Sequence, residues 1–287
     1  MGYIDLHVHS TASDGTLSPC EVVTYAAFKQ LDAIALTDHD TIDGIAEAQR
    51  AAKGTSVELI PGIELSCFYH NTELHLLGFY PDPDSAFLLD GLEEIRHIRM
   101  RRNALMLERF AEDGFAITLE DLTSGHPDTV ITRAHFARIL TEKGYTKSLE
   151  EAFRKYLQYG SRYCTRKEFI SPERAMDLLN QSHAVPVIAH PMQYHMGYQE
   201  IEDMILDLKA LGLAGVEVYH SSHNRYESGK LKEMTHRHHL ISTGGSDFHG
   251  TNKPDIDLGV GRGGLHLSHL FLDQLKEAHN GRTISID

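Results

Sequence analysis

The chain has 287 residues, of which 41% are hydrophobic and 24% are charged. This composition is close to that of ordinary globular domains and excludes collagen-like, coiled-coil and disordered chains. The 27 basic and 41 acidic residues give a net charge of −14, which disfavours sequence-independent binding to duplex DNA through a broad basic surface.

Short apolar runs alternate with amphipathic stretches along most of the chain. The predicted strands are residues 3–8, 33–36, 57–63, 74–79, 185–189, 216–218 and 241–243. Between the first two, Ser18, Pro19 and Glu21 form a helix start with a capping box, and this helix is expected to continue to about residue 30. Gly54 suits the end of the next helix. The alternation predicts an α/β fold of repeated βα units around a parallel sheet.

The alternation is interrupted between residues 85 and 170, where the pattern predicts helices only. These helices cover residues 85–112, 131–141 and 149–156 and are separated by Gly114, Gly144 and Gly160. We interpret residues 85–170 as a helical insertion that forms a substrate cap over the barrel mouth, and residues 1–84 and 171–287 as the barrel domain. No Pro/Gly/Ser linker is visible, so the insertion is expected to be packed rather than tethered. A helix start at Ser171-Pro172-Glu173 resumes the alternation.

Histidines and carboxylates gather at the ends of the predicted strands. His7 and His9 are two residues apart in the first strand, so their side chains share a face. The other candidates lie in the loop after that strand, in the fourth strand, or at and just beyond the ends of later strands: Asp14, His39, Glu64, His75, His190, Asp247 and His249. In (β/α) barrels, active sites are built at the C-terminal edge of the strands.

These six histidines and three carboxylates form a candidate metal centre. Nine ligands are too many for one catalytic zinc ion, which takes about three from the protein. The simplest arrangement divides the nine ligands among three divalent ions, and the mixture of imidazole and carboxylate suits Mn, Fe or Zn. Three carboxylates against three divalent ions leave a net positive pocket inside an acidic protein, so we expect a small anionic, phosphorylated substrate.

Five motifs in this order resemble the PHP (polymerase and histidinol phosphatase) family, and the resemblance covers nearly the whole chain. They are Asp5-Leu6-His7-Val8-His9-Ser10, Ser13-Asp14-Gly15, Leu36-Thr37-Asp38-His39-Asp40, Ala189-His190-Pro191 and Gly245-Ser246-Asp247-Phe248-His249. The resemblance implies a distorted (β/α)7 TIM-like barrel, with the helical insertion over its C-terminal mouth, and a trinuclear centre that hydrolyses phosphoesters. It also implies how the ligands are shared: His7, His9, Glu64 and Asp247 at the first metal, Glu64, His75 and His190 at the second, and Asp14, His39 and His249 at the third.

The insertion is similar to that of a branch acting on nucleoside 3′,5′-bisphosphates and on the 5′ ends of short RNA. The matching segments are Ile131-Thr132-Arg133-Ala134-His135-Phe136-Ala137-Arg138 and Phe153-Arg154-Lys155-Tyr156-Leu157. By this resemblance Arg133 and Lys155 would hold a second phosphate, with His135 beside them. Ser222 and His223, just after the sixth predicted strand, are placed to contact substrate oxygens. The implied reaction is removal of the 3′-phosphate by a hydroxide bridging two metals, with His195 or His223 as the acid for the leaving alcohol.

Several alternatives stay open at this point. Members of that branch often carry Gly-Arg or Gly-Lys shortly after His-Pro, whereas this chain has Met192-Gln193. A phosphate-binding cation is missing there, which keeps 5-phosphoribose 1,2-cyclic phosphate as an alternative substrate, and histidinol phosphate is another. A covalent phosphoenzyme is the competing mechanism. Metal-dependent C–N hydrolysis and a non-catalytic accessory module are the other classes of function; the third-metal set argues against the first, and the complete ligand set against the second.

The remaining features concern partners and location. Short single-stranded RNA could enter an open groove, where Phe136, Tyr156 and Tyr163 would stack on bases, although their helical spacing fits core positions equally well. No run of 18 apolar residues and no signal-like N-terminus occur, so we expect no membrane contact and a cytoplasmic location. Cys20, Cys67 and Cys164 lack Cys-x-x-Cys spacing, which argues against disulfides and a thiolate zinc site.

Overall fold

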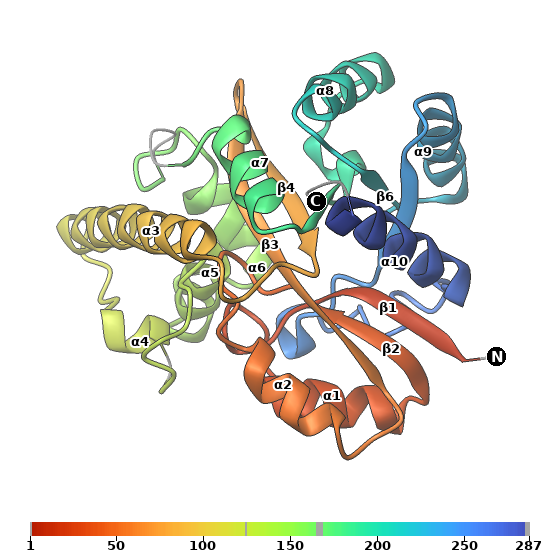
Figure 1. The fold of residues 1–287 in the computed structure, drawn as a ribbon. Helices are drawn as coiled ribbons and strands as arrows, with labels where there is room; N and C mark the ends of the chain where they lie inside the picture. The colour runs from red at the N-terminus through yellow and green to blue at the C-terminus, as the bar shows by residue number, and fades with distance from the viewer. Residues whose placement is uncertain (1, 124, 165–168, 285–287) are drawn as a thin grey trace.

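The computed structural model describes residues 2–123, 125–164 and 169–284, and these form a seven-stranded barrel with helices around it (Figure 1). The strands follow one another in sheet order: β1 (Tyr3–Val8), β2 (Leu31–Leu36), β3 (Glu58–Tyr69), β4 (Thr72–Phe79), β5 (Val185–Ile188), β6 (Gly215–His220) and β7 (Ile241–Gly245). The helices outside the expected insertion are α1 (Pro19–Phe28), α2 (Ile45–Ala52), α7 (Pro172–Gln181), η2 (Pro191–Tyr194), α8 (Tyr198–Ala210), α9 (Arg225–Arg237), η3 (Gly250–Asn252) and α10 (His269–Ile284).

One strand runs against the others. β4 is antiparallel to both β3 and β5, whereas every other neighbouring pair in the sheet is parallel. The expectation of an all-parallel sheet is therefore wrong at residues 74–79. The reason is the connection: only His70 and Asn71 separate β3 from β4, and a parallel crossover needs a dozen or more residues. His70 takes a left-handed conformation (φ 51°) in this tight turn.

The barrel is closed between β1 and the segment that follows β7. The Asp247 N–H donates to the His7 carbonyl at 2.9 Å, and the His9 N–H donates to the Phe248 carbonyl at 3.0 Å. The close approach needs a glycine, because a Cβ on Gly245 would lie 2.2 Å from the Cβ of His7. The two ends of the sheet thus meet at the residues from which the candidate ligands project.

The barrel interior is filled by side chains from β1 to β5 and by the C-terminal helix. Ile4, Ala35 and Val187 pack in one buried cluster with Leu272 and Leu275 of α10. Arg282 of α10 donates to the carbonyl oxygens of Ala184 and Gly212, just before β5 and β6. α10 therefore covers the end of the barrel opposite the mouth, and the candidate site occupies the other end.

The expected helical stretch contains α3 (Ala86–Glu112), α4 (Leu119–Thr123), α5 (Arg133–Glu142), α6 (Leu149–Ala152) and η1 (Phe153–Leu157). These elements lie together on one side of the barrel, away from α8, α9 and α10 (Figure 1). Met106, Phe110, Phe136 and Leu140 are buried in a cluster of their own. Phe136 is thus a core residue, and Tyr156 and Tyr163 pack against the same cluster. α4 was not predicted, and η1 is a turn of π-helix where one continuous α-helix was expected.

Residues 124 and 165–168 of the expected insertion lie outside the described residues. Of the helices that are described, none combines the length and apolar composition that crossing a membrane requires.

Candidate metal centre

The barrel mouth brings all nine predicted ligand residues together. His7 and His9 come from the end of β1, His39 and His190 follow β2 and β5, and Asp247 and His249 follow β7. Asp14 lies in the loop after β1. Eight of the nine side chains belong to buried residues, and His75 is partly exposed. Their common position agrees with the strand-end rule used on the sequence.

Two members reach the mouth differently from expectation. Glu64 does not end a strand, because β3 continues to Tyr69 as the first arm of a hairpin. His75 lies near the start of β4, and since β4 runs in the opposite direction, its first half is at the mouth. Because β4 is antiparallel, His75 lies at the mouth although it is near the start of its strand. In the parallel strands, the residues at the mouth are those at the end of the strand.

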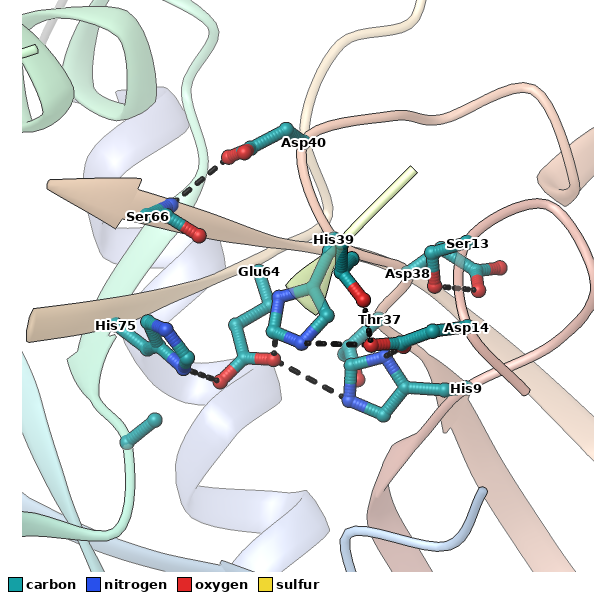
Figure 2. A network of polar contacts seen from close by, with 12 residues as sticks. His9, Ser13, Asp14, Thr37, Asp38, His39, Asp40, Glu64, Ser66 and His75 are labelled. Atoms are coloured by element: carbon teal, nitrogen blue, oxygen red, sulfur yellow. Dashed lines mark hydrogen bonds and ion pairs between the residues drawn. The ribbon is translucent and has the colours of Figure 1, made fainter. Parts of the chain in front are cut away.

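Glu64 is the centre of the arrangement, with histidines on both sides of its carboxylate (Figure 2). Its Oε1 lies 3.1 Å from His75 Nδ1 and 3.1 Å from His190 Nε2. Its Oε2 lies 3.1 to 3.3 Å from ring nitrogens of three more histidines: His7, His9 and His39. One carboxylate thus contacts five imidazole rings.

The other two carboxylates lie on either side of His249. His249 Nε2 is 3.2 Å from Asp14 Oδ1, and His249 Nδ1 is 3.3 Å from Asp247 Oδ1. His39 Nε2 is 3.9 Å from Asp14 Oδ2 on the opposite side. Four groups place one ligand atom per residue within 4.8 Å of one another: His9, Asp14, His39 and His249; His7, Glu64 and His190; His39, Glu64 and His75; His7, His220 and Asp247.

These distances fit metal coordination better than hydrogen bonding. Glu64 Oε2, Asp14 Oδ1 and His39 Nδ1 are buried and have no hydrogen-bond partner among the described residues, although buried polar atoms normally have one. His7 Nε2 and His9 Nε2 are 3.1 Å apart. Two ligand atoms about 2.0 to 2.1 Å from one ion in tetrahedral geometry are about 3.3 Å apart. The residues present therefore fit divalent metal ions.

Further residues orient the predicted ligands. Glu217 on β6 is fully buried; its Oε1 accepts from His7 Nδ1 at 3.0 Å, and its Oε2 accepts from the His190 N–H at 2.8 Å. His249 Nδ1 donates to the Asp247 carbonyl at 2.9 Å. The two ring bonds, at His7 and His249, leave the Nε2 atom of each ring free to face the centre. Sequence reasoning missed Glu217, although a charged residue between two buried valines of a strand is a recognisable signal.

Electrostatics keep the three carboxylates ionised. Burial alone would raise the pKa of Glu64, but the His39, His7 and His75 rings hold it well below its usual range. Asp14 and Asp247 are likewise buried; the His39 and His249 rings hold the pKa of Asp14 well below normal, and Lys253 and His249 do so for Asp247. Burial lowers the pKa of His190 to about 4 and leaves that ring neutral. Ionised carboxylates and a neutral imidazole are the forms that bind metals.

A cavity of about 280 Å³ opens from this centre toward the helices of the expected insertion. His39, His75, His249 and Asp14 line its inner wall, and Thr132, Arg133 and Phe153 line the outer wall. Arg133 forms an ion pair with Glu73 and donates to the Leu157 carbonyl. The cavity is slightly smaller than the usual range for ligand pockets, about 300 to 1,000 Å³, which suits a small molecule.

The other predicted substrate residues do not line this cavity. Lys155 is half-exposed and pairs with Glu151 at 2.6 Å. His195 is exposed, and Ser222 and His223 lie beyond β6, away from the cavity. His135 accepts from the Thr132 N–H, and the Thr132 hydroxyl donates to Asp14 Oδ2 at 2.7 Å. His135 is therefore linked to Asp14 through Thr132.

His220 is a residue that the sequence analysis passed over. Its Nδ1 accepts the Ser222 N–H at 3.0 Å, so a neutral His220 carries its proton on Nε2, which faces Asp247 Oδ2 at 3.3 Å. Lys253 Nζ contacts the same oxygen at 2.5 Å. Lys253 and the His220 ring thus lie beside Asp247 Oδ2, and Asp247 Oδ1 faces His7, His9 and His249. His220 was missed because β6 was expected to end at residue 218, two residues before its observed end.

Known proteins share both sequence and fold with this chain. The PHP domain model matches residues 5–212. A 3′,5′-nucleoside bisphosphate phosphatase from Chromobacterium violaceum is 36% identical over 90% of this chain and 91% of its own length. A 5′-3′ exoribonuclease from Haemophilus influenzae is 33% identical over 85% and 89%. A phosphoribosyl 1,2-cyclic phosphate 1,2-diphosphodiesterase from Eggerthella lenta is 30% identical over 86% and 94%.

A solved structure described as a metal-dependent phosphoesterase, from Bifidobacterium adolescentis, superimposes with a TM-score of 0.85 at 29% identity, over 96% of this chain and 95% of the other. The matched family model, the relatives and the shared fold agree with the metal-binding donor set at the mouth. The chain therefore belongs to the PHP family of metal-dependent phosphoesterases.

Proposed function

We propose that this protein removes the 3′-phosphate from nucleoside 3′,5′-bisphosphates at a centre of three divalent metal ions. The observation that carries the proposal is the Glu64 carboxylate, whose two oxygens contact the rings of five histidines at 3.1 to 3.3 Å. Asp14 and Asp247 provide one further carboxylate on each side of His249. Such a shared ligand suits a cluster of ions better than a single one.

In the reaction, water adds to the 3′-phosphorus, the bond from phosphorus to the 3′-oxygen breaks, and phosphate and a nucleoside 5′-phosphate are released. Bound divalent ions lower the pKa of water and neutralise charge on the phosphoryl oxygens. The chain's own part is to fix the carboxylates: Thr132 holds Asp14, and His220 and Lys253 hold Asp247. His195 and His223 do not line the cavity, and the proposal assigns no proton transfer to them.

Residues 85–170 serve in this proposal as the substrate cap. Thr132, Arg133, Leu149 and Phe153 from this stretch line the cavity opposite the ligand residues. Arg133 directs its guanidinium to Glu73 beside His75. The nucleoside would therefore lie between the barrel mouth and these helices.

The test is phosphate release from adenosine 3′,5′-bisphosphate by protein reconstituted with Mn²⁺, with the nucleotide product identified and bound metal measured. We expect 5′-AMP and phosphate in equal amounts and about three equivalents of metal. Release of 3′-AMP, or activity that survives complete removal of metal, would contradict the proposal. The variant H39A is expected to lose both metal and activity.

A second candidate substrate is 5-phosphoribose 1,2-cyclic phosphate. The E. lenta relative is one observation that favours it. The other is Gln193, which stands where the bisphosphate branch often has a cation and whose amide donates to the Ser222 hydroxyl at 3.2 Å. Running the cyclic ester beside the bisphosphate separates the two candidates, because the cyclic ester must be opened before phosphate can be released.

A further inference from the structure

Helix α3 carries charged residues at positions where its pattern calls for apolar ones. Its buried face includes Leu88 and Ile95 at one end and Met106 and Phe110 at the other, at helical spacing. Between these two apolar parts the same face carries Arg99, Arg102 and Asn103, all buried. Both arginines line the cavity at the metal centre. The apolar stripe is therefore interrupted where the helix passes the cavity.

Among the residues that the structure describes, Arg102 is the one of these charged groups without a carboxylate partner. Its side chain is 2% exposed. Its guanidinium donates to the Asn103 side-chain oxygen at 3.1 to 3.2 Å and to the Ile131 carbonyl at 3.2 Å, and both acceptors are neutral. It also lies 5.9 Å from the Phe169 ring centre. Among the described residues, no carboxylate lies within ion-pair distance of it.

The other cations that line the cavity are paired. Arg99 pairs with Asp40, Arg133 with Glu73, and Lys253 with Asp247. Arg99 also donates to the Ile131 carbonyl, so two guanidinium groups converge on one backbone oxygen. Burial and the neighbouring Arg99 lower the pKa of Arg102, but an arginine remains charged in a protein. A buried, unpaired charge is unfavourable unless something neutralises it.

We propose that Arg102 binds the phosphate group of the substrate that is not hydrolysed, a phosphomonoester dianion, and so makes the site selective for bisphosphorylated substrates. The inference rests on the proposed function, which places the hydrolysed phosphate at Glu64. The contacts of Arg102 assign it to the other phosphate: all of them are with Asn103, Ile131 and Phe169, and none is with a predicted metal ligand. Lys253, by contrast, contacts Asp247.

Equilibrium binding tests Arg102 without any catalysis. Protein loaded with Mn²⁺ would be titrated calorimetrically with 5′-AMP, with ribose 5-phosphate and with adenosine, none of which carries a 3′-phosphate, using wild type, R102Q, R102K and R101Q. Arg101 is the next residue of the same helix and is exposed, so R101Q removes one charge away from the cavity. Charge-assisted, bidentate hydrogen bonds are strong, so we expect R102Q to weaken 5′-AMP binding on the order of 10- to 100-fold, R102K to weaken it less, and R101Q to match wild type.

Comparing ribose 5-phosphate with 5′-AMP shows whether the phosphate group bound by Arg102 belongs to a sugar phosphate or to a nucleotide. If ribose 5-phosphate binds with the same affinity as 5′-AMP and this affinity depends on Arg102, the subsite accepts sugar phosphates in general. If ribose 5-phosphate binds more weakly than 5′-AMP, the subsite prefers nucleotides. Both results support the role of Arg102. Equal affinity of wild type and R102Q for both phosphates overturns the inference. Thermal unfolding controls for the fold, because R102Q removes an unpaired buried charge and is not expected to lower the melting temperature by more than R101Q.

Kinetics give the second readout. The ratio of kcat/KM for adenosine 3′,5′-bisphosphate to that for 3′-AMP should fall on the order of 10- to 100-fold in R102Q, mainly through KM. Equal losses on both substrates would place Arg102 at the hydrolysed phosphate and overturn the inference. If wild type hydrolyses neither substrate, the proposed function fails, while the calorimetric comparison still decides the role of Arg102.

Discussion

Glu64 is held among five histidines, and no lysine or arginine of the described part of the chain forms an ion pair with it. The carboxylate is completely buried, and its ionised state depends on the surrounding rings. Replacing one carboxylate oxygen of Glu64 by an amide nitrogen keeps the shape of the side chain and removes its charge. The site should then lose affinity for each ion that shares this residue.

The variant E64Q is therefore expected to bind fewer metal equivalents than wild type and to lose activity by a factor on the order of 100 or more. Elemental analysis after dialysis against Mn²⁺ measures the bound metal, and phosphate release measures the activity. E58Q on the same strand is the matched control, because Glu58 is exposed and pairs with Lys276. Three equivalents of metal retained by E64Q would show that Glu64 is not a shared ligand.

Residue patterns predicted the candidate site more fully than they predicted its surroundings. His7, His39, His190 and Asp247 were found because side chains at strand ends share one edge of a barrel. Arg102 was not found, because no arginine of this helix was considered as a site residue. Its position three residues after Arg99, on the buried face shared with Ile95 and Met106, is the signal that a count along the helix would have given.

At the scale of elements, strand positions followed from apolar runs, but strand direction did not. Periodicity of two is the same in parallel and antiparallel strands, so the run at residues 74–79 carried no directional information. The two-residue gap between β3 and β4 did indicate the direction of β4, because it is too short for a parallel crossover. The contact of β1 with the segment after β7 could not be read from the sequence either, because the two are joined only by the closure of the whole barrel.

That closure makes a specific prediction for two glycines. In G245A the new methyl group would meet the His7 Cβ at 2.2 Å and the His7 backbone nitrogen at 2.5 Å, so one strand must move. We expect G245A to lower the free energy of unfolding by about 1 to 3 kcal/mol, measured by urea denaturation. The control is G229A in α9, where an added Cβ has no atom within 4 Å and should stabilise the helix by about 1 kcal/mol. Equal effects of the two changes would contradict the closure argument.

A second element-scale prediction concerns pH. Asp257, in the segment between β7 and α10, accepts from Lys29 Nζ at 2.6 Å and from the Tyr25 hydroxyl at 2.7 Å. Partial burial opposes ionisation, but these two donors hold the pKa of Asp257 below its usual value. The resulting stabilisation is complete above the ordinary aspartate pKa, about 4, and is lost as the pH falls through the lower folded value.

D257N should therefore lower the urea midpoint at pH 7, and the difference from wild type should shrink as the pH falls below about 4. D273N, which changes an exposed carboxylate of α10, is expected to show no such trend. A D257N effect that stays constant from pH 7 into acid would mean that the ionised carboxylate is not what stabilises the contact.

At the scale of the whole molecule, the two ends of the barrel are stabilised differently. The end covered by α10 is filled with apolar side chains. The mouth instead buries the three candidate ligand carboxylates, Glu217 and several histidines, and divalent cations bound among them would balance the buried negative charge. Bound ions should therefore contribute to the stability of the folded chain as well as to the reaction.

Chelation is expected to lower the melting temperature on the order of 10 °C, and Mn²⁺ should restore it. Ions at about 1,000 times their dissociation constant stabilise a protein by about 4 kcal/mol, and each kcal/mol corresponds to about 2 to 4 °C for a chain approaching this size. Calorimetry with and without chelator measures the shift. E64Q should show a smaller shift of the melting temperature on chelation. A wild-type melting temperature that does not change on chelation would contradict metal-dependent stability.

The closure of the barrel also determines when the site can form during synthesis. The Ser246 N–H donates to Asp5 Oδ1 across 241 residues of sequence, next to His7 and Asp247. At about 5 to 20 residues per second, the first strand leaves the ribosome on the order of 10 to 50 s before its closing partner. A nascent chain therefore carries His7 and His9 without Asp247 and His249 until translation has passed residue 249.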